Sequence, residues 1–146
     1  MGMNNKTQLI QCSNYSLAST DLASLTVVDT QGFSGCRFIF SFSTITSGAA
    51  TSIGVCGLAT SSPTMTTDDL TGSSITVLDT NDDGVFMIDI KSPTQRYLRP
   101  WVKRATQNAA VGAVIAELYD PIVQPTSLSA TGRGQETWVS PANGTA

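Results

Sequence analysis

Apolar and polar residues alternate along much of this chain with a period of two, which is typical of half-buried β-strands. The clearest example covers residues 36–45, where Phe38, Phe40 and Phe42 fall on one face and mostly polar residues on the other. Each aromatic side chain can bury roughly 150–250 Å². We therefore expect this strand to form the floor of the core.

Shorter runs of β-forming residues between turn signals predict further strands. They cover residues 7–12, 25–30, 51–60, 74–79, 85–90, 97–103 and 108–119. Gly54 and Gly57 predict bulges, and Pro100 predicts an edge strand or a bulge, because proline lacks a ladder donor. Residues 108–119 could instead form a buried helix, but Gly112, the β-branched residues and the short length favour a strand.

Two of these runs, 74–79 and 85–90, flank the turn-forming sequence Asn-Asp-Asp-Gly at residues 81–84, which predicts a β-hairpin. No convincing long helix is apparent. The pattern predicts an all-β fold, a single jelly-roll-like β-sandwich of about seven or eight strands. We expect this domain to cover residues 1–120. Prolines and glycines interrupt residues 121–146, which we expect to form an extended C-terminal arm.

Composition narrows the functional classes. A length of 146 residues fits one domain, and a net charge of −3 argues against a nucleic-acid partner, which requires a basic footprint. No apolar run approaches the length of a membrane span, so we expect no membrane partner. The N-terminus lacks the apolar region of a signal peptide. The cysteines are expected to be buried free thiols, as suits synthesis in a reducing cytoplasm; they are Cys12, Cys36 and Cys56.

Histidine, the commonest general base, is missing. The cysteines are not spaced as metal ligands. Acidic pairs occur at Asp68-Asp69 and Asp82-Asp83, but both lie in expected turns, where no apolar pocket would raise a carboxyl pKa. We therefore predict no enzymatic activity, no catalytic residue, no cofactor and no metal.

A calcium site is the one metal hypothesis that the residues suggest. Residues 79–84 match the first half of an EF-hand loop, but Ile90 stands where the bidentate glutamate belongs, and strands flank the loop. Another calcium geometry stays open, although an acidic turn is the favoured interpretation.

Five of the eight Lys and Arg residues lie between Lys91 and Arg104. In a strand, Leu98 and Val102 would face the core, and an alternating aromatic and cationic row would face outward: Tyr97, Arg99, Trp101 and Lys103. One interpretation is a cationic ladder that pairs with Asp79 or Asp89. The other is a partner interface, because Arg, Tyr and Trp are enriched at binding hot spots.

The arm offers a second candidate contact at Trp138 and Val139, which are isolated among Gly, Ser and Thr. An isolated tryptophan in a tail usually docks. It could return to its own domain or insert into a neighbouring subunit or partner, and a free tail is the third alternative.

A resemblance rests on four runs between Gly84 and Ala116: Gly-Val-Phe-Met-Ile-Asp-Ile from Gly84, Pro-x-x-Arg-Tyr-Leu-Arg-Pro from Pro93, Val-Lys-Arg-Ala-Thr-x-Asn-Ala from Val102, and Val-Ile-Ala from Val114. In these runs the chain resembles a family of small tailed-bacteriophage virion proteins encoded near the major capsid protein. The strong similarity covers about a quarter of the chain, and no catalytic residues belong to that family.

The resemblance implies a structural virion protein, a head decoration or cement protein that binds the major capsid protein on the capsid surface and stabilises the shell. Such a protein would be made in the host bacterial cytoplasm and act as a homo-oligomer, by analogy a trimer. The expected partner-interface residues are Tyr97, Arg99, Trp101, Lys103, Trp138 and Val139. The alternative is a tail or fibre-associated module that binds a host glycan, and a third is a tail-tube or head-completion component.

Overall fold

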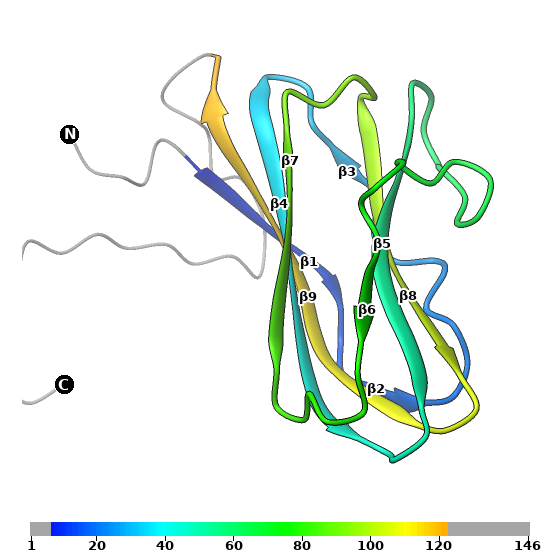
Figure 1. The fold of residues 1–146 in the computed structure, drawn as a ribbon. Helices are drawn as coiled ribbons and strands as arrows, with labels where there is room; N and C mark the ends of the chain where they lie inside the picture. Colours follow the sequence, from blue (N-terminus) through cyan, green and yellow to red (C-terminus); the bar gives the residue numbers. More distant parts are fainter. Residues whose placement is uncertain (1–6, 123–146) are drawn as a thin grey trace, which may run out of the picture.

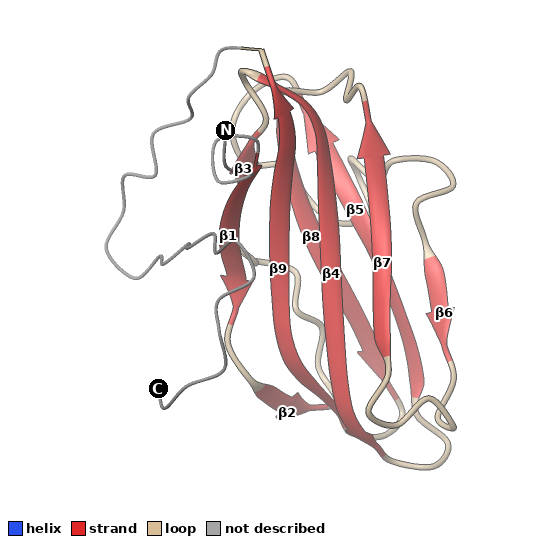
Figure 2. Ribbon diagram, turned by 90° about the vertical axis from the view of Figure 1, so that its left-hand side faces the viewer, coloured by secondary structure: helices blue, strands red, loops and turns tan. Residues whose placement is uncertain are grey.

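Two antiparallel β-sheets pack face to face over residues 7–122, the part of the chain that this computed structural model describes (Figure 1). These residues form nine strands and no helix, so the predicted all-β sandwich is confirmed. Figure 2 looks onto one sheet, with β1, β9, β4 and β7 side by side in front of the other.

Sheet A has the order β1-β9-β4-β7, and β2 pairs with the beginning of β9. Its strands are β1 (Thr7–Ser13), β2 (Ser16–Ala18), β4 (Phe33–Ile45), β7 (Val85–Lys91) and β9 (Ala109–Pro121). Sheet B has the order β3-β8-β5-β6. Its strands are β3 (Val28–Asp29), β5 (Ala50–Leu58), β6 (Ile75–Val77) and β8 (Tyr97–Ala105).

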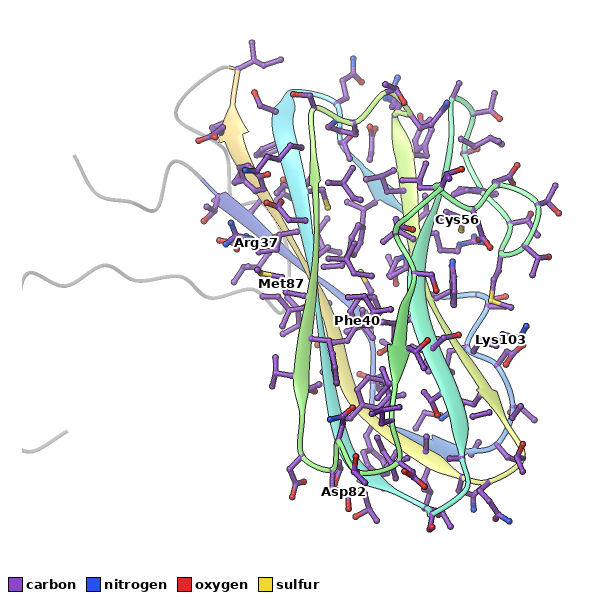
Figure 3. The ribbon with its side chains drawn as sticks, viewed as in Figure 1. Arg37, Phe40, Cys56, Asp82, Met87 and Lys103 are labelled. Carbon is purple, nitrogen blue, oxygen red and sulfur yellow. The ribbon has the colours of Figure 1, made fainter. Side chains whose placement is uncertain are left out.

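The core lies between the sheets and follows the predicted alternation. Phe38 and Phe40 are fully buried and Phe42 is 4% exposed, so the aromatic face of β4 does floor the core. Figure 3 shows Phe40 between the two layers. Leu98 and Val102 of β8 are also fully buried and face it from sheet B, as expected.

The predicted hairpin at residues 79–84 is wrong. β6 pairs with β5 in sheet B, whereas β7 pairs with β4 in sheet A, so the loop crosses from one sheet to the other. Its acidic side chains fix this crossing. Asp82 accepts a hydrogen bond from the Ile45 amide at 2.7 Å, and Asp79 accepts one from the Gly48 amide at 2.8 Å. The loop is therefore bonded to the end of β4 and to the β4–β5 connection, and its two tight turns, at 78–81 and 81–84, do not pair β6 with β7.

Other strand predictions meet mixed outcomes. Residues 109–121 form β9, so the helical alternative is excluded, whereas only Val28–Asp29 of the expected strand at 25–30 is a strand. The bulges expected at Gly54 and Gly57 are absent, because β5 pairs with β8 in continuous register from Ala50 to Leu58.

Pro100 lies on a strand with a neighbour on each side, not on an edge strand. Its missing N–H nevertheless interrupts no ladder hydrogen bond, which is the reason an edge was predicted. On the side of β8 that faces β3, Leu98 pairs with Val28 and Val102 bonds with Leu22. No paired residue lies opposite Pro100 between these two points. The strand is therefore locally an edge where the proline lacks its N–H.

Candidate interaction surfaces

The outward row of β8 does not form the continuous contact surface that the sequence predicts. Lys103 is exposed (Figure 3), Tyr97 and Arg99 are half-buried, and Trp101 is only 5% exposed. These four side chains lie on one face of β8, but each has different neighbours and a different degree of burial. Lys103 presents its surface to solvent, Tyr97 and Arg99 present part of theirs, and Trp101 presents almost none.

Trp101 is buried because it lies on a glycine. In register with it on β5 is Gly54, where an added Cβ would stand 2.2 Å from Trp101 Cζ2. The indole therefore rests directly on the β5 backbone, a close approach that only glycine permits. Its Nε1 is buried without a hydrogen-bond partner among the described residues. A glycine opposite a tryptophan is a sequence signal, but it becomes visible only once the strand register is known.

The two arginines that flank Tyr97 on either side are held within the molecule. Arg99 Nη1 donates to the Pro63 carbonyl at 2.8 Å, which ties β8 to the long β5–β6 connection. Arg96 makes a two-point pair with Asp29, with distances of 2.9 and 2.8 Å, and its guanidinium lies 4.9 Å from the Tyr97 ring centroid. The hydrogen bond from Arg96 lowers the pKa of Asp29.

This pairing corrects the expected cationic ladder with Asp79 or Asp89. Asp79 accepts from a backbone amide, and Asp89 accepts a hydrogen bond from the Tyr119 hydroxyl at 2.7 Å. The ladder prediction assumed that β8 neighbours the strand at 85–91. That strand lies in the other sheet, so its carboxylates are out of reach.

Arg104 is a structural residue that the sequence analysis missed. It is 3% exposed, and its guanidinium donates to the carbonyls of Thr20, Ser16 and Ala109 at 2.6, 3.0 and 3.0 Å. Burial lowers its pKa. The signal was available: Arg104 has the same strand parity as the core residues Leu98 and Val102. A cation at that parity must satisfy its donors inside the fold.

The outer face of sheet A carries the apolar surface that the outer face of β8 lacks. In register across three strands stand Ile115 of β9, Ile39 of β4 and Met87 of β7. On the same face, Val85 lies two residues from Met87 along β7, and Leu9 of β1 lies opposite Glu117, two residues along β9 from Ile115. We call these five residues the outer strip. Met87 is 53%, Val85 67% and Leu9 41% exposed. Met87 points away from sheet B in Figure 3.

A polar row borders the outer strip at the end of the sheet where β9 finishes. Arg37 lies 3.3 Å from Glu117 and 5.4 Å from the Tyr119 ring centroid. The Tyr119 ring crosses β4 over Gly35 and reaches Asp89 on β7. Burial and this hydrogen bond raise the pKa of Tyr119 to about 12. The row joins three strands, so its groups are engaged with one another.

Residues 7–122 assemble no candidate metal site or reactive thiol. Within them no three His, Cys, Asp or Glu side chains come together in a group that could hold a metal ion. Burial raises the pKa of the Cys12 thiol to about 12 and that of Cys56 to about 11, and it also raises that of Cys36. The acids at 79 and 82, the core of the calcium hypothesis, already accept backbone hydrogen bonds.

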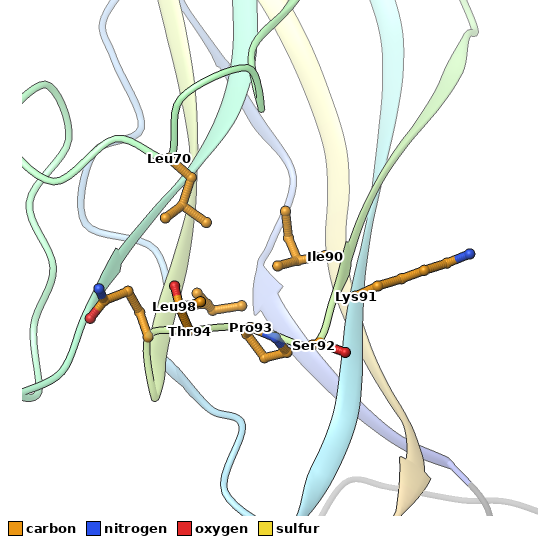
Figure 4. A pocket seen from close by; sticks show the side chains of 8 residues that line it. Leu70, Ile90, Lys91, Ser92, Pro93, Thr94 and Leu98 are labelled. Carbon is orange, nitrogen blue, oxygen red and sulfur yellow. The ribbon is translucent and has the colours of Figure 1, made fainter.

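A small cavity of about 170 Å³ opens beside the β7–β8 connection (Figure 4). Leu70, Ile90, Pro93 and Leu98 supply most of its apolar wall, and Lys91 stands at its rim. No Asp or Glu of residues 7–122 lines it. The cavity can receive an apolar side chain, but it brings together no pair of groups suited to acid–base catalysis.

Trp138 and Val139 lie outside the described residues, so their predicted contact stays a prediction. No helix in residues 7–122 has the length and apolar character needed to cross a membrane. No family model matches the chain, and no curated protein sequence matches it. The resemblance to small phage virion proteins therefore rests on the four runs alone.

Proposed function

We propose that this protein is a capsid decoration protein of a tailed phage, which binds the major capsid protein on the outer surface of the head and stabilises the shell. It acts as a homo-oligomer, preferably a trimer, without cofactor or metal. Each copy would contribute a modest affinity, and simultaneous contacts across the lattice would multiply it.

The observation that supports this proposal is where the four runs between Gly84 and Ala116 lie in the fold. They build nearly all of β7 and β8 and four residues of β9, so they supply strands to both sheets. They also contain Arg96 and Arg104, which hold Asp29 and residues 16–20 of the N-terminal half. A protein that shares these runs would share the arginines that join β8 to the N-terminal half of the chain, and this supports the proposal.

Particles that lack the protein provide the test. Purified protein is added to such heads, and bound copies are counted by gel densitometry after sedimentation, together with the temperature at which the heads release DNA. We expect binding at the copy number of a shell component and a higher release temperature. Binding at the copy number of a tail component would refute the proposal. A glycan-array signal that free sugar competes would favour the host-glycan alternative.

A surface variant addresses the predicted contacts on β8. Replacing Tyr97 and Lys103 with alanine removes one partly exposed and one exposed side chain of the predicted row, and it leaves in place the buried Trp101 and Arg99, which bonds to Pro63. We expect weaker binding to heads. Thr76→Ala, which changes an exposed position of β6 in the same sheet, is the matched control. Equal binding by both variants would remove β8 from the shell contact.

A further inference from the structure

The outer strip is a sheet face without a covering element. Among the described residues nothing packs over Met87 or Val85, which keep more than half of their surface exposed. Ile39 and Ile115 lie in register beside Met87 and are half-buried. Neighbouring strands are about 4.8 Å apart, so the three side chains form an apolar row roughly 10 Å long. That length suits a single large aromatic side chain.

The chain itself contains a segment suited to this face. Residues 123–146 follow β9 directly, and β9 contributes Ile115 to the strip. The last described residue, Ile122, is 75% exposed and bonds to the Gly32 carbonyl at 2.8 Å, so the segment leaves from the end of sheet A itself. Within it the bulkiest apolar side chain is Trp138.

The distances favour docking within one chain. From Ile122 back to Ile115 is seven residues of strand, roughly 23 Å, and Met87 lies two strand spacings to the side, so the span is about 25 Å. Trp138 follows Ile122 by sixteen residues, and a flexible linker of that length has a root-mean-square reach of about 20–24 Å. Effective concentration is highest when reach matches span, and it is then about millimolar.

We infer that the C-terminal segment of the same chain folds back over sheet A and packs Trp138 on the outer strip. Neighbouring residues of an extended segment point to opposite sides, so Val139 would face outward and stay available to a partner. This inference does not depend on the decoration function, because the docked arm is expected in the isolated protein.

Fluorescence quenching tests the contact in the full chain. Met87→Cys introduces a thiol on the strip, and because Cys12, Cys36 and Cys56 are buried, bimane attaches to position 87. Indole quenches bimane at contact distance. We expect Trp138→Phe to abolish this quenching at position 87. Label at Thr76→Cys, on the outer face of β6 in sheet B, should not respond. Equal brightness with and without the indole at 138 would overturn the inference.

Mixing separates the two possible sources of the indole. Labelled Met87→Cys, Trp138→Phe protein is mixed with excess unlabelled wild type. We expect no restored quenching, because each arm covers its own sheet. Quenching on mixing would overturn docking within the chain and assign the strip to the arm of a second copy.

Peroxide oxidation provides an independent measurement without a label. Trp138→Ala should accelerate sulfoxide formation at Met87, read by mass spectrometry, and leave the rate at Met65 in the β5–β6 connection unchanged. Equal acceleration at both methionines would indicate general loosening and count against the inference. Far-UV circular dichroism checks that the sandwich is intact in each variant.

Discussion

Arg104 gives the sharpest test of how this fold is held together. Its guanidinium connects β8 to the carbonyls of Ser16 and Thr20 in the N-terminal segment and to that of Ala109 at the start of β9. Arg104→Met keeps most of the buried stem and removes every donor of the head group. The substitution therefore tests the hydrogen bonds rather than the packing.

Two effects of opposite sign determine how far Arg104→Met lowers the free energy of unfolding. A hydrogen bond to a charged donor is worth about 1.5–3 kcal/mol, and three carbonyls lose such a donor, of which only the one at Ala109 lies in a fully buried bond. Removal of a desolvated cation returns part of that sum. Because the charge leaves together with its donors, no uncompensated ion remains, and we expect a net loss of about 3–5 kcal/mol from the three charge-assisted bonds. That is a large share of a typical domain stability of about 5–15 kcal/mol. At about 4 °C per kcal/mol for a domain of this size, Tm should fall by about 12–20 °C.

Urea denaturation followed by far-UV circular dichroism measures the loss. The matched control is Arg96→Met on the same strand, whose pair with Asp29 is exposed, with side chains 45% and 43% accessible. Solvent screening leaves exposed pairs with little net contribution to stability, so this control should lower stability far less than Arg104→Met. Hydrogen exchange adds a local readout, because the amides of β2 should lose protection in the Arg104 variant and keep it in the Arg96 variant.

The reasoning fails if the two substitutions cost the same within about 1 kcal/mol, a spread typical of exposed pairs. Such a result would mean that water replaces the guanidinium at these carbonyls. Arg104→Lys separates charge from geometry. An ammonium is a compact group that cannot span carbonyls on two sides of the strand. We therefore expect the lysine variant to lie between wild type and Arg104→Met.

Three further predictions follow from local geometry. Gly54→Ala should displace Trp101, cost about 1–3 kcal/mol by overpacking and shift the indole emission to longer wavelength; unchanged emission would contradict the contact. Burial raises the pKa of Tyr119 to about 12, above its unfolded value of about 10. The protonated phenol therefore contributes to folding stability, and this contribution is complete below about pH 10 and is lost as pH rises through about 12. Titration at 295 nm should show one late tyrosine, and Asp89→Asn should move it to lower pH; an unmoved titration would refute the assigned cause. Thiol reagents should modify the three cysteines only after the protein is denatured. Rapid labelling of the native protein would contradict the burial of Cys12, Cys36 and Cys56.

The face of a strand that lies toward the core could be read from the sequence because it depends on parity alone. The alternation at Phe38, Phe40 and Phe42 needs no knowledge of the neighbouring strands, and all three are buried as predicted. The same rule would have placed Arg104 inward had it been applied to a cation. A charged residue on the core side was overlooked because charge was taken as a sign of exposure.

Strand pairing could not be read in the same way. The Asn-Asp-Asp-Gly sequence favours a hairpin locally, yet the loop is bonded to the β4–β5 connection through Asp79 and Asp82. Those partners lie more than thirty residues away, so no local propensity could reveal them. The burial of Trp101 has the same origin, because it depends on the register that brings Gly54 beneath the ring.

The partners of the cations between residues 91 and 104 show that most of this cluster serves the fold rather than a contact surface. Three of its five members are engaged inside the molecule: Arg96 with Asp29, Arg99 with the Pro63 carbonyl, and Arg104 with three carbonyls. A partner that approached β8 would meet Lys103 and only parts of Tyr97 and Arg99. The more extensive apolar surface lies on the opposite sheet, at the outer strip. If heads still bind a variant that lacks both exposed β8 side chains, the shell contact must include sheet A and whatever covers it.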